Sequence, residues 1–270
     1  MRRYITVMIL SLLCISAFAD VTPPTYVFMA PPRQGPVAGA AIYGRIAKFL
    51  TKATGASFTF HYVNNWLTYT EAVRTNQADL YFDGPAFIGW RIARWHDAAA
   101  VALKGQLNLV LVGKAHNQDV TQVSDLIGRG VCAFSPPNLG TLTLESWFQN
   151  PERKPYIVVI HSFPEGMRDI ITGKCVGMME PVPVFKRMSA KFPGLIRIIH
   201  KAALMPNQGF SIGARVPPAL RQKIIAALLS PAGLEATKPL RDMFGHKGLV
   251  ATPDSLYLPY RKLLNVMVGF

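Results

Sequence analysis

The sequence predicts an α/β protein made of two lobes, each a mostly parallel sheet flanked by helices. Short apolar runs alternate with amphipathic stretches along the chain, which is typical of β-α-β units. The alternation occurs twice, before and after a strand-like run that ends near residue 112. The chain has 270 residues, of which 50% are hydrophobic and 16% charged, enough for two folded domains.

The N-terminus has the pattern of an export signal. Arg2 and Arg3 precede an apolar run over residues 5–15, and Ala17 and Ala19 are the small residues that signal peptidase reads. We expect residues 1–19 to be a signal peptide that is cleaved after Ala19, which leaves a periplasmic mature chain. The alternative is an uncleaved anchor, but the run is too short to cross about 30 Å of hydrocarbon.

The first round of elements is delimited by glycine and proline. Gly55 ends the first helical pattern, and Asp83 opens a Gly-Pro turn before another helix. We expect strands at residues 26–30, 57–63, 78–82 and 107–112, and helices at 38–54, 67–75 and 85–96.

The second round repeats this order and ends in helices. Pro164 is well placed as the first residue of its helix. We expect strands at residues 130–134, 156–161, 175–179, 195–201 and 210–214, and helices at 141–148, 164–171, 182–188, 217–229, 234–244 and 256–266.

The chain should cross between the lobes twice, at Val112–Gly113 and near Gln208. The predicted domains are therefore residues 20–112 plus 208–270 for the first lobe and 113–207 for the second. Ligands of open α/β sheets bind beyond the carboxyl ends of the strands, so a two-lobed protein places its site in the cleft between the lobes.

Two cysteines, Cys132 and Cys175, remain after the signal that carries Cys14 is removed. Each lies in a short strand-like run, and paired cysteines are usual in an oxidising compartment. We expect a disulfide between them. Two buried thiols are the alternative.

No catalytic motif is recognisable. The chain has no nucleophile elbow, zinc-binding H-E-x-x-H helix, Walker loop or dinucleotide fingerprint. Its six histidines are scattered singly, without the spacing of metal ligands. We expect neither enzyme activity nor a metal or cofactor.

The charge of the mature chain is strongly basic. Removing Arg2 and Arg3 from 29 basic residues leaves 27 against 15 acidic ones, or +12. This balance favours anionic ligands or anionic lipid surfaces. The basic residues are not clustered with aromatic ones, so we expect no nucleic-acid partner.

Several segments occur in the order found in one family. The chain resembles the periplasmic solute-binding proteins of ABC importers, specifically the phosphate/phosphite/phosphonate-binding type, which has the type II periplasmic binding protein fold. The resembling segments are residues 30–33, 76–85, 135–141, 205–208, 218–220 and 257–261. The resemblance implies a small-molecule ligand and an ABC permease in the inner membrane as partners, and we expect a monomer.

The predicted ligand positions depart from the family pattern. Where phosphonate binders have a run of hydroxyls before a helix, this chain has Leu139-Gly140-Thr141, and the family's His falls on Phe163. A family Tyr falls on Asp83 and an acidic residue on Gln208, whereas an aromatic residue is kept as Trp66. The predicted ligand-binding residues are Arg33, Trp66, Asp83, Asn138, Leu139, Gly140, Thr141, Phe163, Glu180 and Gln208.

The pocket predicted from these residues is more apolar than that of a phosphonate binder. The leading hypothesis is a binding protein that captures a small ligand for an ABC importer by closure of two lobes. The first alternative is a periplasmic carrier or sensor for a lipid-like or amphipathic ligand, not coupled to import. The second alternative is an exported enzyme on the same fold.

Overall fold

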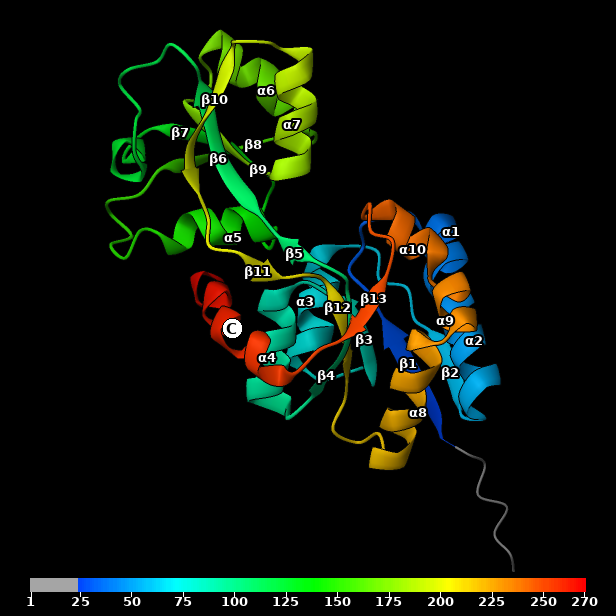
Figure 1. Ribbon diagram of the computed structural model, residues 1–270. Helices are drawn as coiled ribbons and strands as arrows, with labels where there is room; N and C mark the ends of the chain where they lie inside the picture. Colours follow the sequence, from blue (N-terminus) through cyan, green and yellow to red (C-terminus); the bar gives the residue numbers. More distant parts are fainter. Residues whose placement is uncertain (1–23) are drawn as a thin grey trace, which may run out of the picture.

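The computed structural model describes residues 24–270, and it consists of two lobes, each built on its own sheet (Figure 1). The predicted signal peptide lies outside the described residues. Within residues 24–270, no helix is long and apolar enough to cross a membrane. The two-lobed α/β fold agrees with the fold class predicted from the sequence, but both sheets are mixed rather than mostly parallel.

Lobe 1 contains a six-stranded sheet in the order β13-β4-β12-β3-β1-β2. β1 pairs in parallel with β2 and β3, whereas β12 runs antiparallel between β3 and β4. Its strands are β1 (Thr25–Met29), β2 (Ser57–Phe60), β3 (Leu80–Asp83), β4 (Ala98–Leu103), β12 (Gly209–Ile212) and β13 (Leu249–Ala251). β4 and β13 are additions to the predicted elements.

Helices cover both faces of this sheet. One core cluster joins the sheet to the helices α2 and α8, and a second joins it to α3 and α4. The helices are α1 (Pro36–Gly39), the π-helical η1 (Ala40–Gly44), α2 (Arg45–Thr54), α3 (Trp66–Arg74), α4 (Pro85–Trp95), α8 (Pro218–Leu229), α9 (Pro231–Ala236) and α10 (Lys238–Met243). Gly55 ends α2 in the left-handed conformation, with φ of 77°, as glycine allows.

Lobe 2 contains a five-stranded sheet in the order β10-β6-β9-β7-β8, in which β7, β8 and β9 run parallel. Its strands are β6 (Leu109–Lys114), β7 (Gly130–Ala133), β8 (Tyr156–Val159), β9 (Gly177–Pro181) and β10 (Ile196–Lys201). Its helices are the 3-10 helix η2 (Val123–Leu126), α5 (Leu139–Ser146), α6 (Phe163–Thr172) and α7 (Val182–Lys191).

The predicted disulfide is present. Cys132 in β7 is bonded to Cys175, which precedes β9, with their Cα atoms 5.6 Å apart. Because β7 and β9 are neighbours in the sheet, the bond ties two central strands of lobe 2. Both cysteines are buried.

The two lobes are joined by a pair of short antiparallel strands, β5 (Gln106–Leu107) and β11 (Met205–Pro206). The second crossing, at Met205–Pro206, is close to the position expected near Gln208. The first lies earlier than Val112–Gly113, because all of β6 pairs with strands of lobe 2. The apolar run over residues 107–112 concealed this crossing, since Asn108 is its one polar residue and a single polar residue is common within a strand.

The C-terminal segment returns to the region between the lobes. It forms two 3-10 helices, η3 (Asp254–Leu256) and η4 (Leu258–Val266), where an α-helix was predicted. η4 packs against α4 of lobe 1 and α5 of lobe 2. Leu263 belongs to apolar clusters of both lobes. The C-terminal segment therefore contacts both lobes, in addition to the two crossings.

Candidate ligand-binding cleft

A first cavity of about 120 Å³ lies between the lobes. Lobe 1 contributes the loop after β1, the starts of α3 and α4, and the segment before β12, and lobe 2 contributes the loop after β7 and the start of α5. The lining residues are Arg33, Trp66, Gly84, Ala86, Phe87, Pro137, Asn138, Leu139, Leu142 and Gln208.

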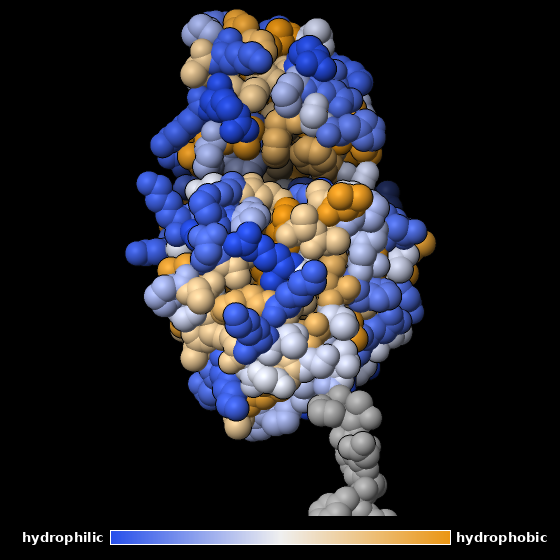
Figure 2. All heavy atoms as spheres, turned by 90° about the vertical axis from the view of Figure 1, so that its right-hand side faces the viewer, coloured by the Kyte–Doolittle hydropathy of each residue, from blue (hydrophilic) through white to orange (hydrophobic). Residues whose placement is uncertain are grey.

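A second, wider cavity of about 430 Å³ adjoins the first. Both share Arg33, Trp66 and Asn138. Figure 2 shows a hollow between the two lobes, bordered by hydrophobic residues. The second cavity is lined by Pro32, Arg33, Trp66, Phe134, Ser135, Asn138, Val159, Ile160 and His161.

Arg33 lies where the two cavities meet. Its guanidinium carbon is 5.9 Å from the ring centre of Trp66 and 5.6 Å from that of Phe244, so two aromatic faces hold the cation. Its Nη1 atom is buried and has no hydrogen-bond partner. The hydroxyl of Tyr43 is also buried and lies next to Arg33; burial raises the Tyr43 pKa, and the charge and hydrogen bonding of Arg33 oppose the rise. Arg33 thus has a buried donor that no protein acceptor fully satisfies.

The start of α5 does not offer a free hydroxyl to the cleft. Thr141 is fully buried, and its hydroxyl donates to the carbonyl of Phe134 at 2.5 Å. The Asn138 side chain caps the helix by accepting from the Gly140 N–H at 2.9 Å. Gly140 leaves room for this cap, because a Cβ atom there would lie 3.1 Å from the Asn138 Oδ1. Asn138 and Leu139 line the cavities, whereas Gly140 and Thr141 do not.

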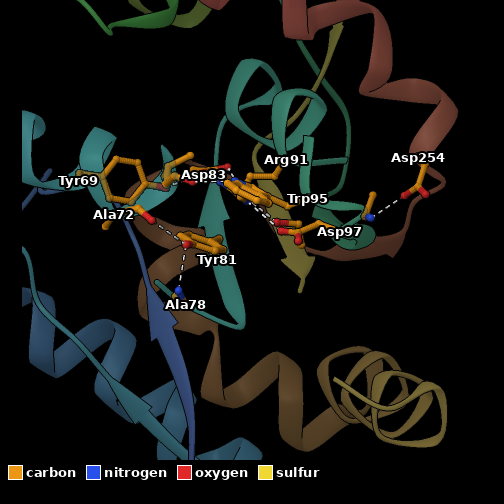
Figure 3. A network of polar contacts seen from close by, with 12 residues as sticks. Tyr69, Ala72, Ala78, Tyr81, Asp83, Arg91, Trp95, Asp97 and Asp254 are labelled. Atoms are coloured by element: carbon orange, nitrogen blue, oxygen red, sulfur yellow. Dashed lines mark hydrogen bonds and ion pairs between the residues drawn. The ribbon is translucent and has the colours of Figure 1, made fainter. Parts of the chain in front are cut away.

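Asp83 does not line either cavity, contrary to the prediction of a polar group facing the ligand. It is fully buried and paired with Arg91, which is two turns along α4 and donates to it at 2.8 and 3.3 Å. Arg91 also donates to Asp97 and Ser211, at 3.1 and 2.5 Å, and it lies over the Tyr81 ring (Figure 3). The carboxylates outweigh the effect of burial and hold the Arg91 pKa above its ordinary value.

This buried cluster supports the cavity wall through Tyr69. The Tyr69 hydroxyl donates a short hydrogen bond to Asp83. Its ring packs edge-on against both Trp66 and Phe87, with ring centres 5.9 and 5.4 Å apart, and both of these residues line the first cavity. Asp83 thus holds Tyr69 in place through this hydrogen bond, and Tyr69 packs against Trp66 and Phe87 of the cavity wall.

Two other predicted polar residues differ in their placement. Gln208 lines the first cavity, and its Oε1 is buried without a partner. Glu180 lies in β9, is 1% exposed, and has no hydrogen-bond partner for either carboxylate oxygen. Burial raises its pKa to about 7, an effect that Arg187 opposes. Glu180 is not among the lining residues of either cavity.

Phe163 is the first residue of α6 and does not contact the cavities directly. Its ring packs edge-on against Phe134, with ring centres 5.0 Å apart, and Phe134 lines the second cavity. Phe163 was predicted as a site residue and Phe134 was not, although Phe134 is the last residue of a predicted strand. Phe87 and Leu142 were also missed, because apolar helix residues give no sign of facing a cleft rather than a core.

The comparisons place the chain in a family. The family described as "ABC transporter, phosphonate, periplasmic substrate-binding protein" matches residues 28–257. The chain belongs to this family. The family is a class of transporter components rather than of enzymes, which agrees with the absence of catalytic motifs. No curated protein sequence matches the chain significantly.

Solved structures of phosphonate-binding proteins share the fold. PhnD1 from Prochlorococcus marinus, solved with methylphosphonate, is 12% identical with a TM-score of 0.66, over 92% of this chain and 100% of that one. A binding component of a phosphonate ABC transporter from Pseudomonas aeruginosa is 14% identical with a TM-score of 0.62, over 90% and 86%. A Xanthomonas citri protein solved with ATP is 11% identical with a TM-score of 0.64, over 88% and 95%.

Proposed function

We propose that this member of the phosphonate-binding family captures an anionic ligand with an apolar body in the cleft between its lobes. The loaded protein would then deliver the ligand to an ABC permease in the inner membrane, as the family description implies. The proposal concerns the ligand's chemistry, which the family assignment leaves open.

The unpartnered Nη1 of Arg33 carries this proposal. A buried donor without a partner is unfavourable by about 1 to 3 kcal/mol, and more when it is charged, so a site that retains one is suited to a ligand acceptor. A carboxylate or other oxyanion between Arg33 and the Asn138 amide would meet donors from both lobes at the point where the two cavities join. Binding there favours the closed arrangement.

The walls of the first cavity favour an apolar body next to that anionic head. Trp66, Phe87, Leu139 and Leu142 contribute aromatic and aliphatic surface from both lobes. Covering such surface is favourable by about 25 cal/mol per Å². The hydroxyl of Thr141 already donates to the Phe134 carbonyl, so a small oxyanion would meet only the Ser135 hydroxyl in place of the run of hydroxyls that the family resemblance leads one to expect. Simple phosphonates should therefore bind poorly.

Closure should rotate the lobes about the β5–β11 pair. Leu142 is fully buried in an apolar cluster with Trp66, Tyr69 and Phe87 of lobe 1, although it belongs to α5 of lobe 2. Rotation that separates the lobes would expose this side chain. The apolar contact and the ligand would therefore stabilise the same closed state.

The direct test is to identify what the protein carries and whether Arg33 holds it. Mass spectrometry of the ligand that co-purifies from the native periplasm gives its identity. Arg33→Gln should then lower affinity for that ligand at least about tenfold, since a hydrogen bond to a charged group contributes about 1.5 to 3 kcal/mol. Arg45→Gln, on the exposed side of α2, is the control and should not change affinity. Equal affinity of Arg33→Gln and the unmodified protein would refute the proposal.

A further inference from the structure

A basic groove lies between α4 and the C-terminal helix η4, separate from both cleft cavities. It has a volume of about 360 Å³ and is lined by Trp90, Ala93, Arg94, Arg261, Lys262 and Asn265. The three cations are exposed, and none of them forms an ion pair with another described residue. We call this region, together with the segment that follows η4, the basic C-terminal surface.

Aromatic and apolar side chains accompany these cations. Arg94 lies over the ring of Trp95, 4.6 Å from its centre, and the Trp95 ring packs against that of Trp90. Val266 and Val268 are 45% and 99% exposed. Val266 ends the helix that carries Arg261 and Lys262, and Val268 follows it by two residues. An almost fully exposed aliphatic side chain is unfavourable in water. Its combination with cations and tryptophans is typical of proteins that rest on a membrane interface.

We propose that the basic C-terminal surface binds peripherally to an anionic phospholipid bilayer. Arg94, Arg261 and Lys262 would contact lipid phosphates. Trp90 and Trp95 would lie at headgroup level, and Val268 would enter the outer edge of the acyl region. This interaction goes beyond ligand capture, and it would keep the loaded protein next to the membrane that contains its permease.

The position of this surface is compatible with an accessible cleft. Figure 1 places η4 on one side of lobe 1 and α1, α2 and α10 on the other. The loop that carries Arg33 leads into α1. A bilayer on the η4 side would therefore leave the α1 side of the lobe unobstructed.

The opposite side of lobe 1 offers a control with the same change in net charge. Lys48 and Lys52 are exposed on α2 and are likewise without ion pairs among the described residues. The paired variants Arg94→Glu/Lys262→Glu and Lys48→Glu/Lys52→Glu both lower the net charge by four. They remove the charge from different sides of lobe 1. Comparing them therefore distinguishes bilayer binding by the basic C-terminal surface from nonspecific attraction of a basic protein to an anionic bilayer.

The test is co-sedimentation of the mature chain with vesicles of equal parts phosphatidylethanolamine and phosphatidylglycerol, with phosphatidylcholine vesicles as the neutral comparison. Each cation next to an anionic bilayer contributes about 1 kcal/mol, or about fivefold in affinity. Arg94→Glu/Lys262→Glu should thus weaken binding at least about 25-fold, and Lys48→Glu/Lys52→Glu less than about threefold. Val268→Trp should strengthen binding and Val268→Asp should weaken it.

The proposal would be overturned by a lack of binding to the anionic vesicles at low salt, or by equal losses of binding in the two paired variants. It would also be overturned if the Val268 substitutions left vesicle binding unchanged. Full release from the vesicles by millimolar inorganic phosphate would indicate a site for free anions and would overturn it as well. Circular dichroism establishes that each variant is folded. Calorimetric titration of each variant with octanoate, as a probe of the cleft, keeps this test separate from that of the proposed function, because variants that lose vesicle binding should bind octanoate as the unmodified protein does.

Discussion

The two groups of polar residues next to the cleft differ in how completely the protein satisfies them. In the cluster around Arg91, the guanidinium donates to Asp83, Asp97 and Ser211, and a single carboxylate oxygen, of Asp97, lacks a partner. In the cleft, Arg33 and Gln208 each keep a buried polar atom without any partner.

This difference separates structural charges from groups that can recognise a ligand. A buried charge that has lost its partner destabilises the fold strongly, so protein groups must complete the Arg91 cluster. A polar atom that protein groups leave incomplete can be completed by a ligand. The comparison predicts that substitutions in the Arg91 cluster act on stability, whereas substitutions at Arg33 act on binding.

The largest effect is expected from Arg91→Ala. It leaves the buried carboxylates of Asp83 and Asp97 uncompensated, which should lower the free energy of unfolding by about 3 to 5 kcal/mol. Urea denaturation measures this change. Arg33→Ala is the matched control on a half-buried arginine and should change stability by less than about 1 kcal/mol. Similar decreases in the free energy of unfolding for the two variants would contradict a purely structural role for the Arg91 cluster and a binding role for Arg33.

The disulfide should stabilise lobe 2 without affecting recognition. Cys132 and Cys175 are 43 positions apart in the sequence, and the chain-entropy relation gives up to about 4 kcal/mol for a loop of this length. Replacing both with serine should lower the free energy of unfolding by as much as this and leave ligand affinity within about twofold. A large loss of affinity in a folded double variant would show that the disulfide shapes the cleft.

Glu180 should make stability depend on pH. Its pKa is about 7 in the fold against an ordinary value of 4.5, so between these pH values the folded protein holds a proton that the unfolded chain has released. The free energy of unfolding therefore falls as pH rises from about 4.5 to about 7. At about 1.4 kcal/mol per pH unit, the cost above pH 7 is on the order of 3 kcal/mol.

Glu180→Gln removes this titration. The variant should be more stable than the unmodified protein above pH 7, and the difference should shrink as pH falls toward 4.5. Denaturant unfolding at several pH values measures both trends. A constant difference between the two proteins across this range would contradict a buried carboxylate without partners.

The smallest effect is expected from Thr141→Val. The hydroxyl bonds to the Phe134 carbonyl, so its removal should lower the free energy of unfolding by about 1 kcal/mol. Ligand affinity should stay within about twofold. A tenfold loss of affinity without loss of stability would mean that this hydroxyl reaches the ligand after all.

Periodicity predicted most of the fold, and its failures have identifiable causes. β4 was missed because its Ala-Ala-Ala-Val-Ala-Leu sequence lacks the branched and aromatic residues of most strands. Its strand conformation depends on pairing with β12 and β13, which are distant in the sequence. The predicted C-terminal α-helix is instead a 3-10 segment between α4 and α5, a position that only tertiary packing determines.

The sequence predicted the cavity-lining residues whose position next to a strand or helix end is enough to place them at the cleft. Five predicted residues lie in loops next to strands or at the starts of helices, and all of them line a cavity: Arg33, Trp66, Asn138, Leu139 and Gln208. Asp83 also lies between a strand and a helix, but its carboxylate is paired with Arg91 on that helix and does not face the cavity. The local sequence around Asp83 does not reveal this ion pair.

Calorimetric titration tests the central claim most directly, that the cleft recognises an anionic head through Arg33 and an apolar body through its walls. The titrants are octanoate, methylphosphonate and phosphite, each with the unmodified protein and with Arg33→Gln. Octanoate should bind measurably and lose at least about tenfold in affinity in the variant, and both small oxyanions should bind more weakly than about 1 mM. Micromolar or tighter binding of methylphosphonate or phosphite would contradict the account.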